Sequence, residues 1–302
     1  MICTLCPRQC GAARDEVHGE GWCGLPALPM CARAALHRWE EPCLSGKNGA
    51  GTVFFSGCTL GCVFCQNGPI SRGNFGRTMT EDELYAALQR LAAQGAACIE
   101  LVTPSQFSHV LARVLERPVP GGLPVVWNSG GYERVETLRS LEGKVDVYLP
   151  DLKYVTPALA EKDSGAADYP DAAMAAILEM YRQRGPVRLE GGLLKSGVLI
   201  RHLVLPGQTA EAKRVMDWVA FTFPPGAVLF SLLAQYTPMV EAPMGLLDGF
   251  PELRRPLRPS ELRTAREYME NLGLAGYVQE LGSVGTEFIP AFDLTGLGAP
   301  GG

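Results

Sequence analysis

The sequence predicts an α/β fold, a partial (β/α)6 TIM-like barrel that follows an irregular, cysteine-rich N-terminal segment. Two observations carry this prediction. From residue 51 on, short apolar runs alternate about six times with amphipathic segments, as in a parallel sheet with right-handed crossovers. Residues 1–50 instead show little periodicity and contain six of the ten cysteines. An open doubly wound sheet is the alternative, and in either fold the active site lies at the carboxyl ends of the strands.

The expected strands are short β-branched and aromatic runs between turn residues. They lie at 51–57, 98–103, 124–128, 145–149, within 197–207, at 227–233 and, as a short last strand, at 277–282. Helices are expected at 80–95, 105–117, 132–142, 169–185, 209–223 and 260–273. Thr80 and Glu83 form a capping-box pattern and Gly95 can end that helix, while Pro170 and Ser260 mark two later helix starts.

The chain is therefore expected to have three parts, a cysteine-rich module at 1–50, a (β/α) core at 51–282 and a flexible tail at 283–302. A net charge of −5 offers no basic excess for nucleic acid or an anionic membrane. No apolar run approaches the roughly 20 residues of a membrane span, and the N-terminus lacks the apolar core of a secretory signal. A cytoplasmic location is expected, where the cysteines stay reduced.

Three cysteines follow the first expected strand directly, in the stretch SGCTLGCVFCQNG. Cys58, Cys62 and Cys65 thus lie in the first strand-to-helix loop, on the catalytic face of such a fold. Thiolates favour zinc, copper(I) or iron–sulfur clusters. Zinc usually takes four ligands, and no fourth stands nearby, whereas a 4Fe–4S cluster on three cysteines leaves one iron open for a small molecule. The alternative is a zinc site that borrows a distant ligand such as Cys98.

The spacing of Cys58, Cys62 and Cys65, with Phe64 before the third cysteine, resembles the signature of the radical S-adenosylmethionine (SAM) superfamily. Over most of residues 51–282 the chain also resembles the subgroup related to pyruvate formate-lyase activating enzyme. The stretches that carry this second resemblance are GTVFFSGCTLGCVFCQN, NSGGYE, YLPDLKY, RHLVLPG and AQYTP, with CTLCPRQCG and GEGWCG before them.

The resemblance implies that the three cysteines each bind one iron of a 4Fe–4S cluster, whose fourth iron chelates SAM. One electron, supplied by a donor such as flavodoxin or ferredoxin, would cleave SAM to methionine and a 5′-deoxyadenosyl radical that abstracts a hydrogen atom. In an activating enzyme that hydrogen comes from a glycine of a partner glycyl-radical enzyme. A different peptide, a cofactor precursor or a metabolite is the alternative substrate, and a non-enzymatic zinc-scaffolded interaction protein is the third hypothesis.

Candidate SAM contacts stand at the ends of the later strands. Where many relatives carry Gly-Gly-Glu, this chain has VTPSQF, and Thr103 is the nearest polar residue. Asn128 and Ser129 resemble the family segment that contacts the SAM amino group, although a glycine turn explains them equally. Asp151 and Lys153, two positions apart on an extended segment, point to one side, and by resemblance Lys153 would neutralise the SAM carboxylate. A solvated ion pair is the alternative for these two.

Further along, the stretch LIRHLVLPG places Arg201 and His202 inside a strand. Neighbours in a strand point to opposite faces, so one of the two must face the barrel interior or the ligand. His202 is a candidate cofactor contact, with a core histidine as the alternative. Gln235 and Tyr236, after the sixth strand, are weaker candidates, and Phe64 is expected beside the cofactor.

Four N-terminal cysteines stand at the spacing Cys-x2-Cys-x3-Cys-x12-Cys. They suit a structural zinc site that folds a segment with little core, or a second iron–sulfur cluster, and unligated thiols are the plain alternative. The remaining three cysteines have no partner at a convincing spacing, and Cys98 is expected to be a small core residue. The four are Cys3, Cys6, Cys10 and Cys23, and the three are Cys31, Cys43 and Cys98.

Overall fold

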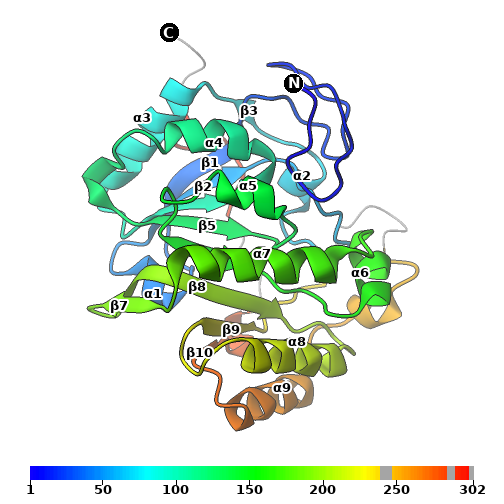
Figure 1. Ribbon diagram of the computed structural model, residues 1–302. Helices are drawn as coiled ribbons and strands as arrows, with labels where there is room; N and C mark the ends of the chain where they lie inside the picture. Colours follow the sequence, from blue (N-terminus) through cyan, green and yellow to red (C-terminus); the bar gives the residue numbers. More distant parts are fainter. Residues whose placement is uncertain (239–246, 284–289, 299–302) are drawn as a thin grey trace.

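The centre of the molecule is one sheet in the order β10-β9-β8-β6-β5-β4-β2-β1-β3, with β7 paired to β8. The structure is a computed structural model that describes residues 1–238, 247–283 and 290–298 (Figure 1). From β2 to β10 along this order, neighbouring strands are parallel, while β1 and β3 are antiparallel additions at one edge. The predicted α/β fold is therefore confirmed, with a mostly parallel sheet that stays open, as in a partial barrel.

All expected strands and helices are present, with shifted boundaries. The strands are β1 (Met30–His37), β2 (Ala50–Phe55), β3 (Arg77–Thr78), β4 (Ile99–Val102), β5 (Val125–Ser129), β6 (Val147–Pro150), β7 (Arg188–Glu190), β8 (Leu193–Leu203), β9 (Leu229–Leu233) and β10 (Gly276–Val278). The helices are α1 (Pro42–Ser45), α2 (Gly68–Ser71), α3 (Glu81–Ala93), α4 (Ser108–Val114), α5 (Val135–Arg139), α6 (Pro157–Ser164), α7 (Tyr169–Arg184), α8 (Thr209–Thr222) and α9 (Pro259–Asn271). Short 3-10 turns lie at Ser105–Phe107, Pro120–Gly122, Pro251–Arg254 and Leu281–Ser283.

The starts of α3 and α9 show where local sequence signals predict a helix boundary and where they do not. The capping box at α3 is present, because the Thr80 hydroxyl accepts the Glu83 N–H and the Glu83 carboxylate accepts the Thr80 N–H. At α9 the expectation that Ser260 is the cap is wrong. Pro259 already occupies the first helical position, which its fixed φ suits, so that Ser260 lies inside the helix.

Successive residues of a strand point to opposite faces of the sheet, and the side chains on the two faces form separate apolar cores. Val53, Leu101, Trp127 and Ile200 pack with the helices in the largest core, and Figure 1 shows α3, α4, α5, α7, α8 and α9 along that face of the sheet. Their strand neighbours instead turn to the concave face, the interior of the partial barrel. There Val126, Leu149, Leu199 and Leu229 form a second core, with Cys43 and Leu44 of α1 and with Cys98. Since Cys43 and Leu44 pack against the beginnings of these strands, α1 closes the interior at its amino end.

The N-terminal segment is less irregular than expected. Residues 30–37 form β1, which runs antiparallel to β2 from the pair Arg33–Phe54 to the pair His37–Ala50. This pairing delivers residues 38–41 to the amino end of β2, just before α1. Residues 1–29 hold no helix or strand beyond isolated bridges. They are tied down by Arg14, which is buried and donates to the Leu25 and Gln106 carbonyl oxygens.

The described part of the expected C-terminal tail, residues 290–298, packs against β1. The Leu294 N–H donates to the Ala32 carbonyl, and the Ala34 N–H donates to the Thr295 carbonyl. Leu297 is buried. Residues 290–298 thus cover part of β1, and the rest of the expected tail, 284–289 and 299–302, lies outside the described residues. Among the described helices, none combines the length and apolarity needed to cross a bilayer.

Candidate functional site

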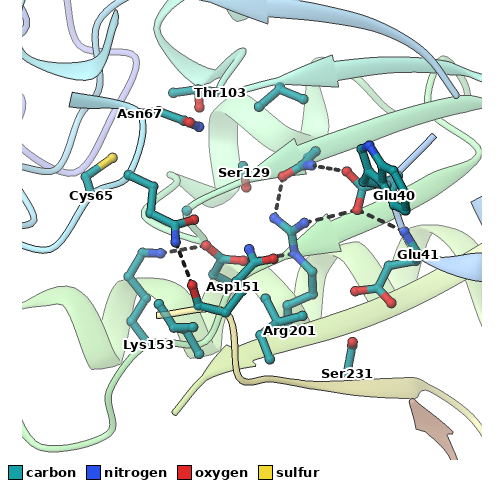
Figure 2. Close-up of a pocket in the computed structure, with 18 of the residues that line it drawn as sticks. Glu40, Glu41, Cys65, Asn67, Thr103, Ser129, Asp151, Lys153, Arg201 and Ser231 are labelled. Carbon is teal, nitrogen blue, oxygen red and sulfur yellow. Dashed lines mark hydrogen bonds and ion pairs between the residues drawn. The ribbon is translucent and has the colours of Figure 1, made fainter. Parts of the chain in front are cut away.

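A cavity of about 730 Å³ occupies the barrel interior and opens at the carboxyl ends of the strands (Figure 2). Its walls come from the loop after β2, from the ends of β4, β5, β6, β8 and β9, and from residues 37–42. This volume lies within the range of small-molecule sites, about 300–1,000 Å³. The cavity is where barrel enzymes carry their active sites.

Cys58, Cys62 and Cys65 all line this cavity, in the loop after β2. Burial, followed by the neighbouring thiolates of Cys62 and Cys65, raises the pKa of Cys58 to about 12. Metal ligation needs deprotonated thiols. A strongly cationic metal group is what would let these three ionise together, so the donor set fits an iron–sulfur cluster.

Each of the three sulfurs accepts one hydrogen bond from a different part of the chain. The donors are the Leu60 N–H to Cys58 at 3.4 Å, the Ser164 hydroxyl to Cys62 at 2.9 Å and the Ser71 hydroxyl to Cys65 at 3.3 Å. Hydrogen bonds to sulfur stabilise the anionic thiolate and orient it. The chain therefore holds all three sulfurs in place around the mouth of the cavity.

Asp151 stands between two cations in the middle of the cavity wall. Its carboxylate accepts from Lys153 Nζ at 2.5 Å and from Arg201 Nε at 3.0 Å (Figure 2). Burial alone would raise the pKa of Asp151, but the Lys153 and Arg201 charges outweigh it and hold that pKa below its usual value. Burial opposes the Lys153 charge in the same way, and Asp151 outweighs it, so the pKa of Lys153 is raised. All three groups are charged near neutral pH.

Asn128 continues this network towards the barrel interior. Its side-chain oxygen accepts from Arg201 Nη2 at 2.6 Å, and its nitrogen donates to Glu100 at 2.7 Å. Glu100 is fully buried, and burial together with the charge of Glu40 raises its pKa well above the usual value. Asn128 thus lines the cavity with its polar atoms already paired.

Ser129 and Thr103 line the cavity at neighbouring strand ends. The Ser129 hydroxyl donates to the buried carboxylate of Glu133 at 2.8 Å, a group that also accepts from Trp127 Nε1 at 2.7 Å. Thr103 has φ +58°, in the left-handed region that a β-branched residue rarely adopts. Such strain persists only where the surroundings fix it, and it gathers at ligand sites.

Phe64, Arg201 and Gln235 also line the cavity, whereas His202 and Tyr236 do not. The Phe64 ring packs edge-on against Tyr154 with its centroid 6.0 Å from Lys153 Nζ. The expectation of a His202 contact is not met. Because Arg201 takes the interior face, His202 turns to the helix side, where Nδ1 lies 2.8 Å from the Leu152 carbonyl oxygen.

Sequence reasoning missed the far end of the cavity, which residues 37–42 supply. Trp39, Glu40 and Glu41 line it there, opposite Ser231 of β9. Glu40 pairs with Arg201 at 3.3 Å. The one available signal was the pair of glutamates before a proline in HRWEEPC. It carries meaning only once β1 is known to run antiparallel beside β2.

The four N-terminal cysteines meet around a second, small cavity. Cys3, Cys6, Cys10 and Cys23 line it together with Arg14 and Thr59, and Arg14 Nη1 lies 3.4 Å from the Cys3 sulfur. Thr59 directly follows Cys58, so this cavity adjoins the loop of the first three cysteines. Burial, with smaller contributions from the other three thiolates, raises the pKa of Cys6 to about 11.

Among the described residues, no three His, Cys, Asp or Glu side chains are grouped so as to hold a single metal ion. The ligands of one zinc ion must crowd together, because Zn–S bonds are only about 2.3 Å long. Cysteines of an iron–sulfur cluster bind different irons and stand further apart. The zinc alternative for Cys58, Cys62 and Cys65 therefore gains no support, and Cys98 is buried away from them in the core that α1 closes.

Comparison with known proteins adds the deciding observation. The sequence profile of the "Radical SAM superfamily" matches residues 52–219, more than half of the chain. The chain belongs to the radical SAM superfamily. Membership implies a 4Fe–4S cluster and SAM, and makes the protein a radical SAM enzyme by family.

Individual relatives are distant. An uncharacterized protein from Methanocaldococcus jannaschii is 27% identical over 280 residues, which cover 90% of this chain and 75% of the relative. The solved structure of Streptococcus suis SuiB is 12% identical with a TM-score of 0.52, covering 76% of this chain and 48% of SuiB. A radical SAM methyltransferase from Sphaerobacter thermophilus is 16% identical with a TM-score of 0.50, covering 76% of this chain and 66% of that one. At such identities the two structures support the fold alone, and this radical SAM chain spans only about half of SuiB.

Proposed function

We propose that this protein binds a 4Fe–4S cluster through Cys58, Cys62 and Cys65 and cleaves SAM reductively beside it. The observation that carries the proposal is the convergence of these three hydrogen-bonded thiols on one large cavity. When bound, the cluster supplies the electron that splits SAM, and the resulting 5′-deoxyadenosyl radical takes a hydrogen atom from the substrate.

The chain's own groups would bind and shield SAM. Lys153 offers a buried positive charge for the SAM carboxylate, held in place by Asp151. Phe64 covers the same region with an apolar ring, which excludes water from the cysteines. Thr103, Asn128, Ser129 and Arg201 supply further polar atoms along the strand ends.

The test of the cysteine assignment is iron and acid-labile sulfide per chain after anaerobic reconstitution. Cys58→Ala, Cys62→Ala and Cys65→Ala should each lose about four irons per chain, and Cys98→Ala should lose none. A change in the electron paramagnetic resonance spectrum of the reduced protein on adding SAM should follow in the wild type. Full iron content in all three variants would contradict the proposal.

For the substrate, we propose a glycine of a partner glycyl-radical enzyme, on the sequence resemblance to activating enzymes. A different peptide is the second candidate, because SuiB has been solved bound to a precursor peptide. The two are separated by offering α-deuterated glycine in the partner enzyme and deuterated residues in the peptide. Deuterium in 5′-deoxyadenosine from one of them identifies the hydrogen donor. A flavodoxin or ferredoxin as electron donor and a cytoplasmic location remain predictions.

We propose further that Cys3, Cys6, Cys10 and Cys23 hold a metal group of their own. Their support is the shared small cavity next to Thr59. Since no three of the described side chains are grouped for one metal ion, a zinc ion would have to draw these thiols closer together, and a second iron–sulfur cluster is the alternative. Metal analysis of a Cys6→Ala, Cys10→Ala double variant decides between them. Loss of zinc alone identifies a zinc site, and loss of about four irons identifies a cluster. An unchanged metal content would contradict this second site.

A further inference from the structure

The end of the cavity remote from the cysteines is acidic and aromatic. Trp39, Glu40 and Glu41 line it. Figure 2 shows Cys65 at one end of the view and Glu40 and Glu41 at the other, with Asp151 and Arg201 between them. If SAM lies beside the cysteines and Lys153, this remote end is where the substrate must reach.

The charges in the cavity do not balance at this end. Lys153 is satisfied by Asp151, and Arg201 is shared between Asp151 and Glu40. Glu41 is only 8% exposed. Within the described residues no lysine, arginine or histidine lies in ion-pair distance of its carboxylate. A buried carboxylate without a cation is costly, so its presence calls for a reason.

No structural role of Glu41 supplies that reason. It stands at the N-cap of α1, but its side chain makes no capping hydrogen bond there. Among the described residues, Ser231 is the side chain that hydrogen-bonds the carboxyl group of Glu41. Glu41 therefore presents a desolvated carboxyl group to the cavity, and a cation bound beside it would favour the charged form of that group.

Trp39 adds a second feature that selects for a cation. Its indole lines the same end of the cavity, and the residue is 67% exposed. Indole is the side chain that attracts cations best through its π face. Proteins often bind ammonium and guanidinium groups between an aromatic ring and a carboxylate.

We propose that the substrate carries a cationic group, a protonated amine or a guanidinium, which binds between the Glu41 carboxylate and the Trp39 indole. This inference rests on the proposed function, since it places the substrate in the cavity that the cofactors share. It narrows the substrates to cationic ones, such as a lysine- or arginine-containing segment or a free amine.

The experiment is calorimetric titration of the reconstituted, SAM-loaded protein without reductant. The probes are N-acetyl-lysine amide, agmatine and the neutral isostere N-acetyl-norleucine amide. At least one cationic probe should bind at least about tenfold more tightly than the isostere. Glu41→Gln should weaken that binding at least about tenfold, and Trp39→Ala, which changes an exposed side chain, should weaken it as well. Glu190→Gln, at an exposed position on β7, serves as the matched control and should not change it.

Three results would overturn the inference. They are no binding of either cationic probe, equal binding of the isostere, and unchanged binding in Glu41→Gln that retains its iron. The failure of the proposed function looks different, because there the wild type forms no 5′-deoxyadenosine when reductant is added. A protein that forms 5′-deoxyadenosine but ignores cations keeps the function and loses only the cationic substrate.

Discussion

The Ser164 hydroxyl donates to the Cys62 sulfur over 2.9 Å, across 102 positions of the chain. Ser164 is the last residue of α6, and Tyr154 Oη lies 3.0 Å from its hydroxyl oxygen. With the Ser164 proton directed at sulfur, Tyr154 donates to Ser164, so that two hydroxyl groups in series stabilise a negative sulfur. A helix from another part of the fold therefore stabilises the thiolate of Cys62, one of the three proposed cluster ligands.

Ser164→Ala should keep the iron content but lower the reduction potential of the cluster. Hydrogen bonds to sulfur favour the more negative, reduced state, and their loss shifts the potential down. A shift of roughly 60 mV is expected, a tenfold change in the one-electron equilibrium constant. Potentiometric titration measures it. Ser140→Ala, on a hydroxyl that donates to the Thr137 carbonyl, is the control. A potential equal to that of the wild type would show that the hydroxyl does not act on the cluster.

Asp151→Asn should destabilise the fold, because it leaves the buried Lys153 without a counter-charge and leaves Arg201 paired with Glu40 alone. These side chains are 14–21% exposed, so the loss should be roughly 2–4 kcal/mol in the free energy of unfolding at pH 7. Urea unfolding measures this loss. Asp248→Asn breaks the exposed pair with Arg254 and should cost less than about 1 kcal/mol. Equal effects of the two variants would contradict the buried network.

The stability of the protein should depend on pH through Glu41. Burial, then the charge of Glu40, raises the pKa of Glu41 to about 7, against about 4.3 in the unfolded chain. Between these two pKa values the folded state binds more protons than the unfolded chain. The stability that protonated Glu41 contributes is therefore fully present below pH 4 and is lost as the pH rises through 7. The charged or titratable groups that face Glu41 are Glu40, Arg201, Asp151, Cys43 and Tyr277.

Glutamine cannot titrate. As the pH rises from 5 to 8, the free energy of unfolding of Glu41→Gln should therefore increase relative to that of the wild type by roughly 1–3 kcal/mol. Urea unfolding of both proteins at several pH values gives the difference. A constant difference across this range would mean that Glu41 titrates normally and is not held desolvated.

Cys98→Ala should behave as a core substitution and not as the loss of a metal ligand. Cys98 is 2% exposed, and its thiol lies 3.6 Å from the Leu44 carbonyl oxygen. We expect unchanged iron and zinc content and a loss of about 1 kcal/mol in the free energy of unfolding. Loss of a metal ion in this variant would instead restore the zinc site that the sequence left open.

The parallel core could be predicted because its signals are local. The run CIELVT and the capping box at Thr80 specify β4 and α3 without reference to distant residues. β1 was missed, since MCARAALH has no regular alternation and becomes a strand only by pairing with β2. The eight residues of α6 are similarly too few for a helical pattern to be recognised.

The site divides in the same way. The spacing of Cys58, Cys62 and Cys65, their place after a strand and the family resemblance together predicted these three as ligands. Strand alternation predicted that only one of Arg201 and His202 would face the interior. Which of the two residues faces the interior depends on how β8 packs against the helices, and no local sequence pattern predicts that packing. Glu40 and Glu41 reach the cavity only through the antiparallel pairing of β1, so their role was hidden for the same reason as the strand.

The most direct test of the central claim is the formation of 5′-deoxyadenosine by the reconstituted protein. Under strict anaerobiosis with dithionite and SAM, the wild type should produce 5′-deoxyadenosine and methionine in equal amounts, and Cys58→Ala should produce neither above the background. Wild-type protein with a full iron content that forms no more 5′-deoxyadenosine than Cys58→Ala would contradict the account.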